Sequence, residues 1–112
     1  DIFVQEFGDE MMFEVDVFWV KAADLDPVSL IKGLSGRVSQ LHLKDIKKGL
    51  KLPMYGGLPK EAFKELGNGM IPMEPIIEAA KAAGVAHCHV EQDQSPDPIA
   101  SIKESVAYLK GL

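Results

Sequence analysis

The sequence predicts an α/β fold in which helices cover a parallel β-sheet. The first observation is that strand-like and helix-like segments alternate three times along the chain, after an opening helix. The second is that the strand-like segments are apolar at consecutive positions, which is typical of strands buried on both faces. No repeat or change of composition interrupts this order, so residues 1–112 are expected to form a single domain.

Three segments are expected to be the strands of the sheet. They are "MMFEVDVFWV" at residues 11–20, "RVSQLHLKD" at 37–45 and "VAHCHVEQD" at 85–93. Their β-branched, aromatic and other apolar residues favour strands. Residues 46–71 separate the second strand from the next helix, and their prolines and glycines predict a long loop able to close over a site.

Four segments have helical spacing, and each carries a start or end signal. Asp26 and Asp97 are expected N-caps, because each is followed by a proline that suits the first helical position. Pro75 opens another helix that Gly84 closes, and Gly8 ends the first one. The helices are predicted at residues 1–10, 26–34, 72–84 and 97–112. The last has an apolar face made of Ile99, Ile102, Val106 and Leu109.

Composition and charge narrow the functional classes. An apolar content of 46% suffices for one modest core, and a net charge of −5 with scattered basic residues argues against a nucleic-acid partner. The single cysteine, Cys88, excludes an intramolecular disulfide and favours the cytoplasm, and its apolar surroundings predict a small buried thiol. No apolar stretch reaches the roughly 18 residues of a membrane span, so no membrane partner is expected.

Polar side chains gather at the carboxyl ends of all three predicted strands. Parallel α/β folds place their sites at that edge, because helices seal the other surfaces of the sheet. The residues are Asp16 in the first strand, His42, Lys44 and Asp45 in the second, and Glu91 and Asp93 in the third. If Asp16, His42 and Glu91 all face inward, they form a set of two oxygen ligands and one nitrogen ligand. Such a set suits one divalent ion, which we expect to be Mn, Mg, Co or Zn.

The stretch "HCHVEQDQ" at residues 87–94 places two histidines and a glutamate at alternate positions. A strand points His87, His89 and Glu91 to one face and Cys88 to the other. Glu91 lies at the end of this strand, whereas the two histidines lie deeper. We therefore expect Glu91 to be the metal ligand here and the histidines to fill the interior.

Four motifs in this order, "FEVDVFW", "LHLKD", "ELGNGMI" and "HVEQD", closely resemble the sugar phosphate isomerase/epimerase group of the xylose-isomerase-like TIM barrels. The resemblance covers essentially the whole chain and implies the last three strand–helix units of a TIM (β/α)8 barrel. It implies that Asp16, His42 and Glu91 are metal ligands from the sixth, seventh and eighth strands. The family's fourth ligand, a glutamate on the fifth strand, has no counterpart in this sequence.

The resemblance also implies a reaction. Family epimerases use two glutamates to exchange a proton at a carbon next to a carbonyl, while the metal polarises the substrate oxygens. Glu91 would be one of the pair, and the substrate a sugar or sugar phosphate. Lys44 is expected either to contact an anionic substrate group or to pair with Asp45, itself a candidate substrate contact. Trp19 is expected to form an apolar wall for a sugar ring, or else to pack against a helix.

Other functional classes are weighed against this one. The three-metal DNA-repair endonucleases of the same superfamily are disfavoured, because Trp19, Ala62 and Lys64 stand where those enzymes carry metal-binding residues. A sugar dehydratase using the same proton abstraction, or a non-catalytic binding or assembly module, remains an alternative. A closed barrel takes about 250 residues. The chain is therefore expected to be the C-terminal part of a longer enzyme, inactive alone and forming homo-oligomers through its exposed strand face.

Overall fold

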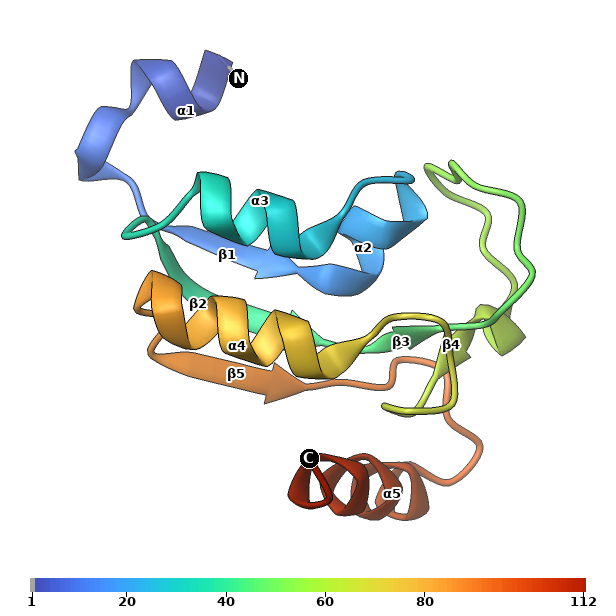
Figure 1. Cartoon of the computed structure of the whole chain (residues 1–112). Coiled ribbons are helices and arrows are strands. Elements are labelled where there is room, and N and C mark those ends of the chain that lie inside the picture. The colour runs from blue at the N-terminus through green and yellow to red at the C-terminus, as the bar shows by residue number, and fades with distance from the viewer. Residues whose placement is uncertain (1) are drawn as a thin grey trace.

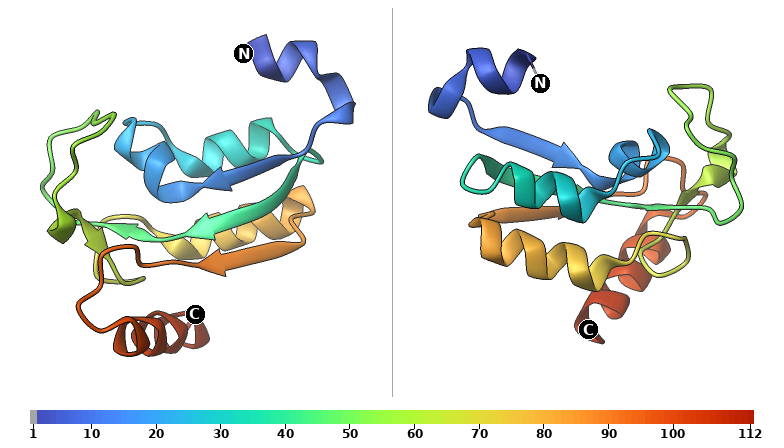
Figure 2. Two further views of the ribbon diagram at one scale, coloured as in Figure 1. Left: turned by 180° about the vertical axis from the view of Figure 1, so that it is seen from behind. Right: turned by 45° about the horizontal axis from the view of Figure 1, so that its top comes forward.

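A computed structural model describes residues 2–112 and contains a three-stranded parallel sheet (Figure 1). Its strands are β1 (Phe13–Asp16), β2 (Val38–Leu43) and β5 (His87–Val90), in the order β1-β2-β5. Helices α3 (Pro27–Gly33) and α4 (Met73–Ala83) lie on one face of the sheet, and Figure 2 shows the opposite face uncovered. The predicted α/β class and parallel sheet are confirmed.

The register brings the ends of the three strands level. Asp16 of β1 lies opposite His42 of β2, and His42 lies opposite His89 of β5. The backbone N–H of Glu91 donates to the carbonyl of Leu43 at 3.0 Å, which extends the pairing just beyond β5. Polar residues from three distant parts of the sequence therefore meet at one edge of the sheet.

The hydrophobic core lies between the sheet and the helices on its covered face. Val15 and Leu41 point into it from β1 and β2, alternating with residues that point to the uncovered face. Helices supply the opposite side of the core, including the fully buried Ile31 and Ile76. The uncovered face carries Glu14, Gln40, His42 and His89, so the chain presents a polar surface where a closed barrel has its interior.

The first strand is shorter than predicted, and this part of the sequence-based prediction is wrong. β1 ends at Asp16, and α2 (Val17–Ala22) begins at the next residue. Asp16 Oδ1 accepts hydrogen bonds from the backbone N–H groups of Phe18 and Trp19 at 3.0 and 3.3 Å, which caps the helix. Val17 and Phe18 are both fully buried, and a buried start of a helix is as apolar as a buried strand. The apolar residues of this stretch therefore could not distinguish the two.

The long connection between β2 and α4 contains some regular structure. Strands β3 (Asp45–Ile46) and β4 (Phe63–Lys64) form a short antiparallel pair, and a 3₁₀ turn at Lys60–Ala62 precedes β4. The predicted caps are present at Asp26, and at Gly84, where φ is 79°. Helix α4 starts at Met73, so Pro75 lies inside its first turn.

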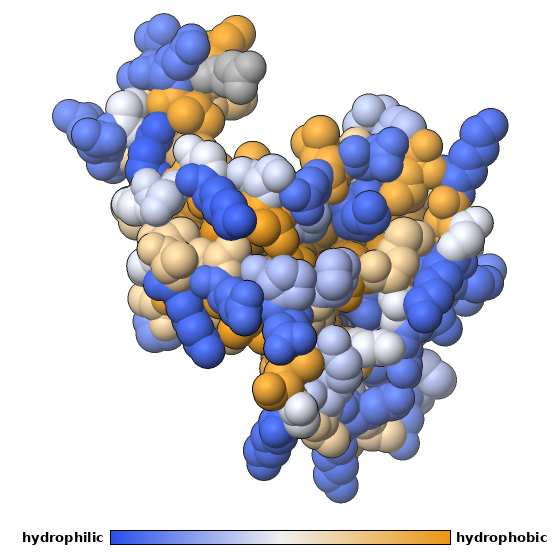
Figure 3. Space-filling view, viewed as in Figure 1, coloured by the Kyte–Doolittle hydropathy of each residue, from blue (hydrophilic) through white to orange (hydrophobic). Residues whose placement is uncertain are grey.

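The N-terminal segment and the last helix leave apolar side chains at the surface. Helix α1 (Ile2–Glu6) precedes a 3₁₀ turn at Gly8–Glu10, and Figure 3 shows apolar atoms at this end. Helix α5 (Pro98–Lys110) buries Ser101 and Ser105, whereas most of its predicted apolar face is exposed. Cys88 is exposed too, so the expectation of a buried thiol is wrong. No helix within residues 2–112 has the length and apolar character needed to cross a bilayer.

Candidate metal centre

Asp16 lies where β1 turns into α2, and its two oxygens have different environments. Oδ1 is engaged by the first N–H groups of α2, as described above. Oδ2 faces the strand ends, 3.0 Å from Lys44 Nζ and 3.8 Å from His42 Nδ1. The helix start therefore fixes the carboxylate and leaves one oxygen for the site.

His42 has its ring held from behind. Nε2 lies 2.6 Å from Glu14 Oε1, two residues earlier in register on the neighbouring strand. Nδ1 faces the other way, 3.2 Å from Glu91 Oε2. The ring of His89 packs edge-on against that of His42 with 5.6 Å between centroids, and its Nε2 contacts Gln40 Oε1 at 2.6 Å. His89 therefore supports the ring of His42 from the neighbouring strand, at the same level of the sheet.

Asp16, His42 and Glu91 each offer a ligand atom, and the three atoms lie within 4.8 Å of one another. The side chains are 19%, 25% and 30% exposed, so each is held by its surroundings yet reachable from solvent. Each comes from a different strand end. Two carboxylate oxygens and one imidazole nitrogen at this spacing fit a divalent ion of the Mn, Co or Zn type, and also Mg when water completes the ligand set.

Lys44 places a positive charge among the carboxylates. Its side chain is 6% exposed, and Nζ lies 3.0 Å from Asp16 Oδ2, 2.8 Å from Glu91 Oε2 and 2.8 Å from Asp93 Oδ2. Burial alone would lower the pKa of Lys44, but hydrogen bonds to Asp93, Glu91 and Asp16 raise it above its ordinary value. The expected alternative pairing with Asp45 is wrong, since the ion pairs of Lys44 go to these three acids.

Asp45 has a different task from the expected substrate contact. It is fully buried, and its carboxylate accepts four backbone hydrogen bonds at 2.8–3.1 Å. The donors are the N–H groups of Ile46, Gly67, Gly69 and Ile71. Both oxygens are therefore used to hold the "GNGMI" segment beside β3, and the expected contact with a substrate is not supported.

Gly67 and Gly69 are needed by this arrangement. Gly67 has a φ of +90°, and a Cβ on it would collide with the ring of Tyr108. A Cβ on Gly69 would collide with the carboxylate of Asp45 and the carbonyl of Ile46. Both glycines are thus explained by close approach of the backbone to other parts of the protein.

Trp19 and Phe18 have different environments. Phe18 is fully buried and stacks on Phe63 with 4.5 Å between ring centroids. Trp19 is 44% exposed and meets Phe63 edge-on at 6.3 Å. Its backbone N–H donates to Asp16 Oδ1, so Trp19 lies in the first turn of α2, next to one of the candidate ligands. Trp19 therefore remains available as an apolar wall, whereas Phe18 belongs to the core.

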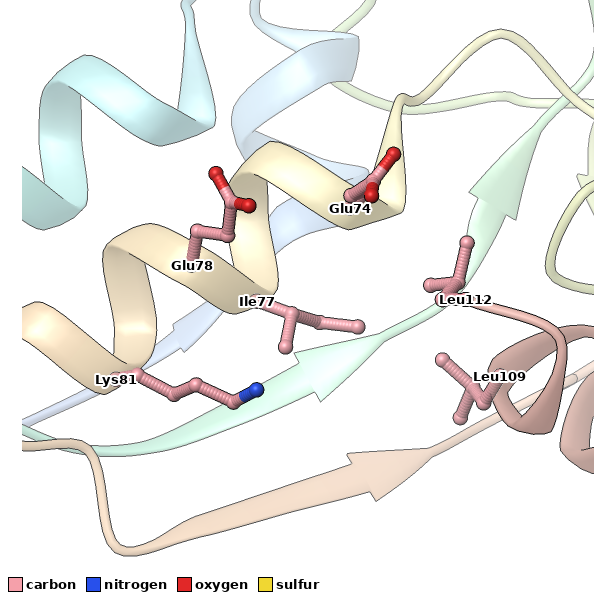
Figure 4. A pocket seen from close by; sticks show the side chains of 6 residues that line it. All are labelled: Glu74, Ile77, Glu78, Lys81, Leu109 and Leu112. Atoms are coloured by element: carbon pink, nitrogen blue, oxygen red, sulfur yellow. The ribbon is translucent and has the colours of Figure 1, made fainter.

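Two surface hollows accompany this fold, and neither is lined by the three candidate ligands in the part of the chain described. One, of about 410 Å³, lies beside the loop that follows β5 and is lined by Phe63, Glu65 and Gln92 among others. The other, of about 220 Å³, lies between α4 and α5, with Ile77 and Leu109 inside it (Figure 4). The second is on the covered side of the sheet, so the chemistry of the strand ends does not reach it.

Asp93 is the site residue to which the sequence assigned no role. It follows Glu91 by two residues and completes the set of acids around Lys44. Its place at the polar end of "HVEQD" was visible in the sequence. The backbone conformation after β5 could not be predicted from the sequence. This conformation determines where the side chain of Asp93 points, because Asp93 lies outside a regular strand.

Comparison with protein-family models and with curated proteins found no match. Among solved structures, the chain is similar to the crystal structure of a sugar phosphate isomerase/epimerase from Parabacteroides distasonis, with a TM-score of 0.65 and 28% identity. The match covers 90% of this chain and 31% of that one, so the chain spans about a third of its length. The expected resemblance and the partial TIM-barrel architecture are thus confirmed.

Proposed function

We propose that the chain is part of a divalent-metal-dependent sugar or sugar-phosphate isomerase/epimerase. The observation that carries this proposal is the convergence of Asp16, His42 and Glu91 from three strand ends, with ligand atoms within 4.8 Å. The similarity to a solved sugar phosphate isomerase/epimerase supports the reaction class. A sugar dehydratase that uses the same proton abstraction would need the same residues, and the products of the assay below distinguish it.

Asp16, His42 and Glu91 are the proposed ligands for one Mn, Mg, Co or Zn ion. Glu14 engages Nε2 of His42, so that Nδ1 is the nitrogen presented to the ion. When bound, the ion would polarise the oxygens of the substrate. The chain's own part is to fix three donors on a rigid sheet, where neighbouring strands prevent them from moving apart.

Glu91 is the proposed proton-transfer residue. Its carboxylate is half-buried at the open end of β5, and its ion pairs with His42 and Lys44 run through Oε2. The other oxygen is therefore the one offered to a substrate hydrogen next to a carbonyl. The second proton-carrying glutamate and the fourth ligand have no counterpart in this sequence, and for this reason we propose that the chain alone is inactive.

The proposed substrate is a small sugar or sugar phosphate. Trp19 would lie against an apolar face of the sugar ring, and Lys44 would attract an anionic group. A lone cysteine without a disulfide partner supports the cytoplasm as the compartment. A second copy is the proposed protein partner, through the exposed strand face.

The test is proton exchange by the full-length protein in deuterated water, followed by NMR on a panel of ketoses and ketose phosphates. Deuterium is expected at the carbon next to the carbonyl only when a divalent ion is present. Glu91→Gln should abolish the exchange while the protein stays folded. Glu78→Gln, on the covered side, should leave the exchange unchanged. Turnover that survives Glu91→Gln would indicate that Glu91 has no catalytic role. Absence of turnover with every substrate and metal would favour the binding or assembly module.

A further inference from the structure

Lys44 occupies the same two oxygen atoms that the proposed metal requires. Its Nζ lies 3.0 Å from Asp16 Oδ2 and 2.8 Å from Glu91 Oε2. Asp16 Oδ2 is the oxygen left over by the helix cap, and Glu91 Oε2 is the one that faces Nδ1 of His42. The ammonium group and a divalent ion would therefore compete for the same lone pairs.

The surroundings make this competition strong. The Lys44 side chain is 6% exposed, so its charge is screened by water less than that of a surface lysine. Two cations within a few ångströms in such a place repel each other. A metal ion that takes both oxygens thus removes two of the three acidic partners of Lys44 and adds a repulsive charge, so the ammonium group must move.

Asp93 can keep its ion pair with Lys44 when a metal ion takes the other two acids. It is bound to Nζ at 2.8 Å, and it is not among the three residues whose ligand atoms converge. Its side chain is 43% exposed, the most open of the three acids around Lys44. A lysine held by Asp93 alone would be displaced toward the solvent side of the cluster.

We propose that Lys44 is a built-in counter-cation that neutralises Asp16 and Glu91 in the metal-free protein and is displaced toward Asp93 when a divalent ion binds. This inference rests on the proposed metal site. It has two consequences. Lys44 lowers the affinity for metal, and the amine becomes available to an anionic substrate group only after the metal has bound.

The test is calorimetric titration of MnCl₂ into the wild-type protein and three variants. Lys44→Met is expected to bind Mn²⁺ about tenfold more tightly or better, because the competing charge is gone. Lys44→Arg retains the competitor and should stay within about threefold of wild type. Lys48→Met removes the same charge from an exposed position four residues away, so it measures the general field of the protein.

The outcomes separate the two proposals. The inference is supported if Lys44→Met is the only variant that binds Mn²⁺ more tightly than wild type. It is supported as well if Lys44→Met binds Mn²⁺ and wild type shows no measurable binding. Wild type binding Mn²⁺ as tightly as, or more tightly than, Lys44→Met overturns it while leaving the metal site intact. Binding by none of the variants overturns the metal site and the inference with it.

A second measurement on wild type avoids dependence on a variant that fails to fold. An amine-acylating reagent is applied with and without Mn²⁺, and the modification of each lysine is read by peptide mass spectrometry. Acylation of Lys44 is expected to rise severalfold with Mn²⁺, whereas that of Lys48 should not change. Unchanged acylation of Lys44 at a Mn²⁺ concentration that saturates the calorimetric signal would overturn the displacement.

Discussion

Glu14 and His42 form a 2.6 Å contact that decides which nitrogen of the imidazole faces the candidate ligands. The two residues lie on neighbouring parallel strands, and Glu14 stands one layer below Asp16 on the same face of β1. Because Nε2 is engaged by this carboxylate, an N–H placed there would leave the lone pair of Nδ1 free for a metal ion held by Asp16 and Glu91. Glu14 thus orients the ring of His42 from outside the set of three candidate ligands.

Glu14→Ala is therefore expected to weaken Mn²⁺ binding by about tenfold or more, since the ring loses its preferred orientation and tautomer. Calorimetric titration measures this, with Glu10→Ala as the matched loss of an exposed carboxylate nearby in sequence. Glu14→Gln retains a hydrogen-bond acceptor and should recover part of the affinity. Equal affinity of wild type and Glu14→Ala would mean that the contact has no part in orienting His42.

Asp45 is expected to be a stability residue rather than a substrate contact. Asp45→Ala leaves four backbone N–H groups without an acceptor, and those of Ile46 and Ile71 are buried, so the change should cost at least about 3 kcal/mol of unfolding free energy. Urea denaturation followed by circular dichroism measures the loss. Asp26→Ala, which removes an exposed helix cap, should cost clearly less. Comparable losses would argue that the four hydrogen bonds contribute little.

Gly69 tests the same segment from the other side. In Gly69→Ala the new methyl group would meet the Asp45 carboxylate and the backbone carbonyl of Ile46, neither of which can move freely. A loss of about 2 kcal/mol or more is expected in the same denaturation experiment. Gly56→Ala is the control, because nothing lies within 4 Å of its Cβ position. A destabilised Gly56→Ala with an unaffected Gly69→Ala would contradict the described packing.

The candidate ligands were predictable from the sequence because strand geometry is regular. Side chains alternate between the two faces along a strand, so Glu91 shares the face of His89, which lies opposite His42. Parallel pairing sets the strand ends side by side and places Asp16 opposite His42. These two rules predict that the three residues meet at one edge, but they bring Lys44 and Asp93 to the same edge as well. The resemblance to a known family pointed to the same three residues.

The roles of Asp45 and Lys44 were not predictable in the same way. Asp45 accepts hydrogen bonds from residues 22 to 26 positions away, through a loop whose path no local pattern determines. Lys44 was expected to contact either an anionic substrate group or Asp45, whereas its ion pairs go to Asp16, Glu91 and Asp93, the last two of which lie beyond the end of β5. Likewise, the exposed side of α5 depends on where the helix docks rather than on its spacing.

The uncovered face of the sheet predicts self-association. Glu14, His87 and His89 are exposed there, although the same positions point inward in a closed barrel. We expect sedimentation equilibrium to give at least twice the monomer mass, and His89→Lys to shift the protein toward monomer. Glu78→Lys, on the covered side, should not change the mass. A wild-type monomer at all concentrations would refute this pairing.

The environment of Glu65 predicts that the free energy of unfolding decreases at acidic pH. Burial opposes the charge of Glu65, but hydrogen bonds from Ser101 Oγ at 2.5 Å and Gln92 Nε2 at 3.2 Å outweigh it and lower the pKa of its carboxyl. A lowered pKa means that the stabilisation is present above the ordinary range for glutamate, about 4.3, and is lost as the pH falls through the folded value.

Urea midpoints at pH 7 and pH 3.5 test this relation. Wild type should lose more stability between the two than Glu65→Gln does, because the amide cannot titrate and binds Ser101 equally at both. Glu61→Gln, an exposed neighbour, should lose as much as wild type. Other carboxylates titrate in the same range, so the difference between variants carries the result. An identical loss in Glu65→Gln and wild type would show that Glu65 holds the end of β4 to α5 without help from its charge.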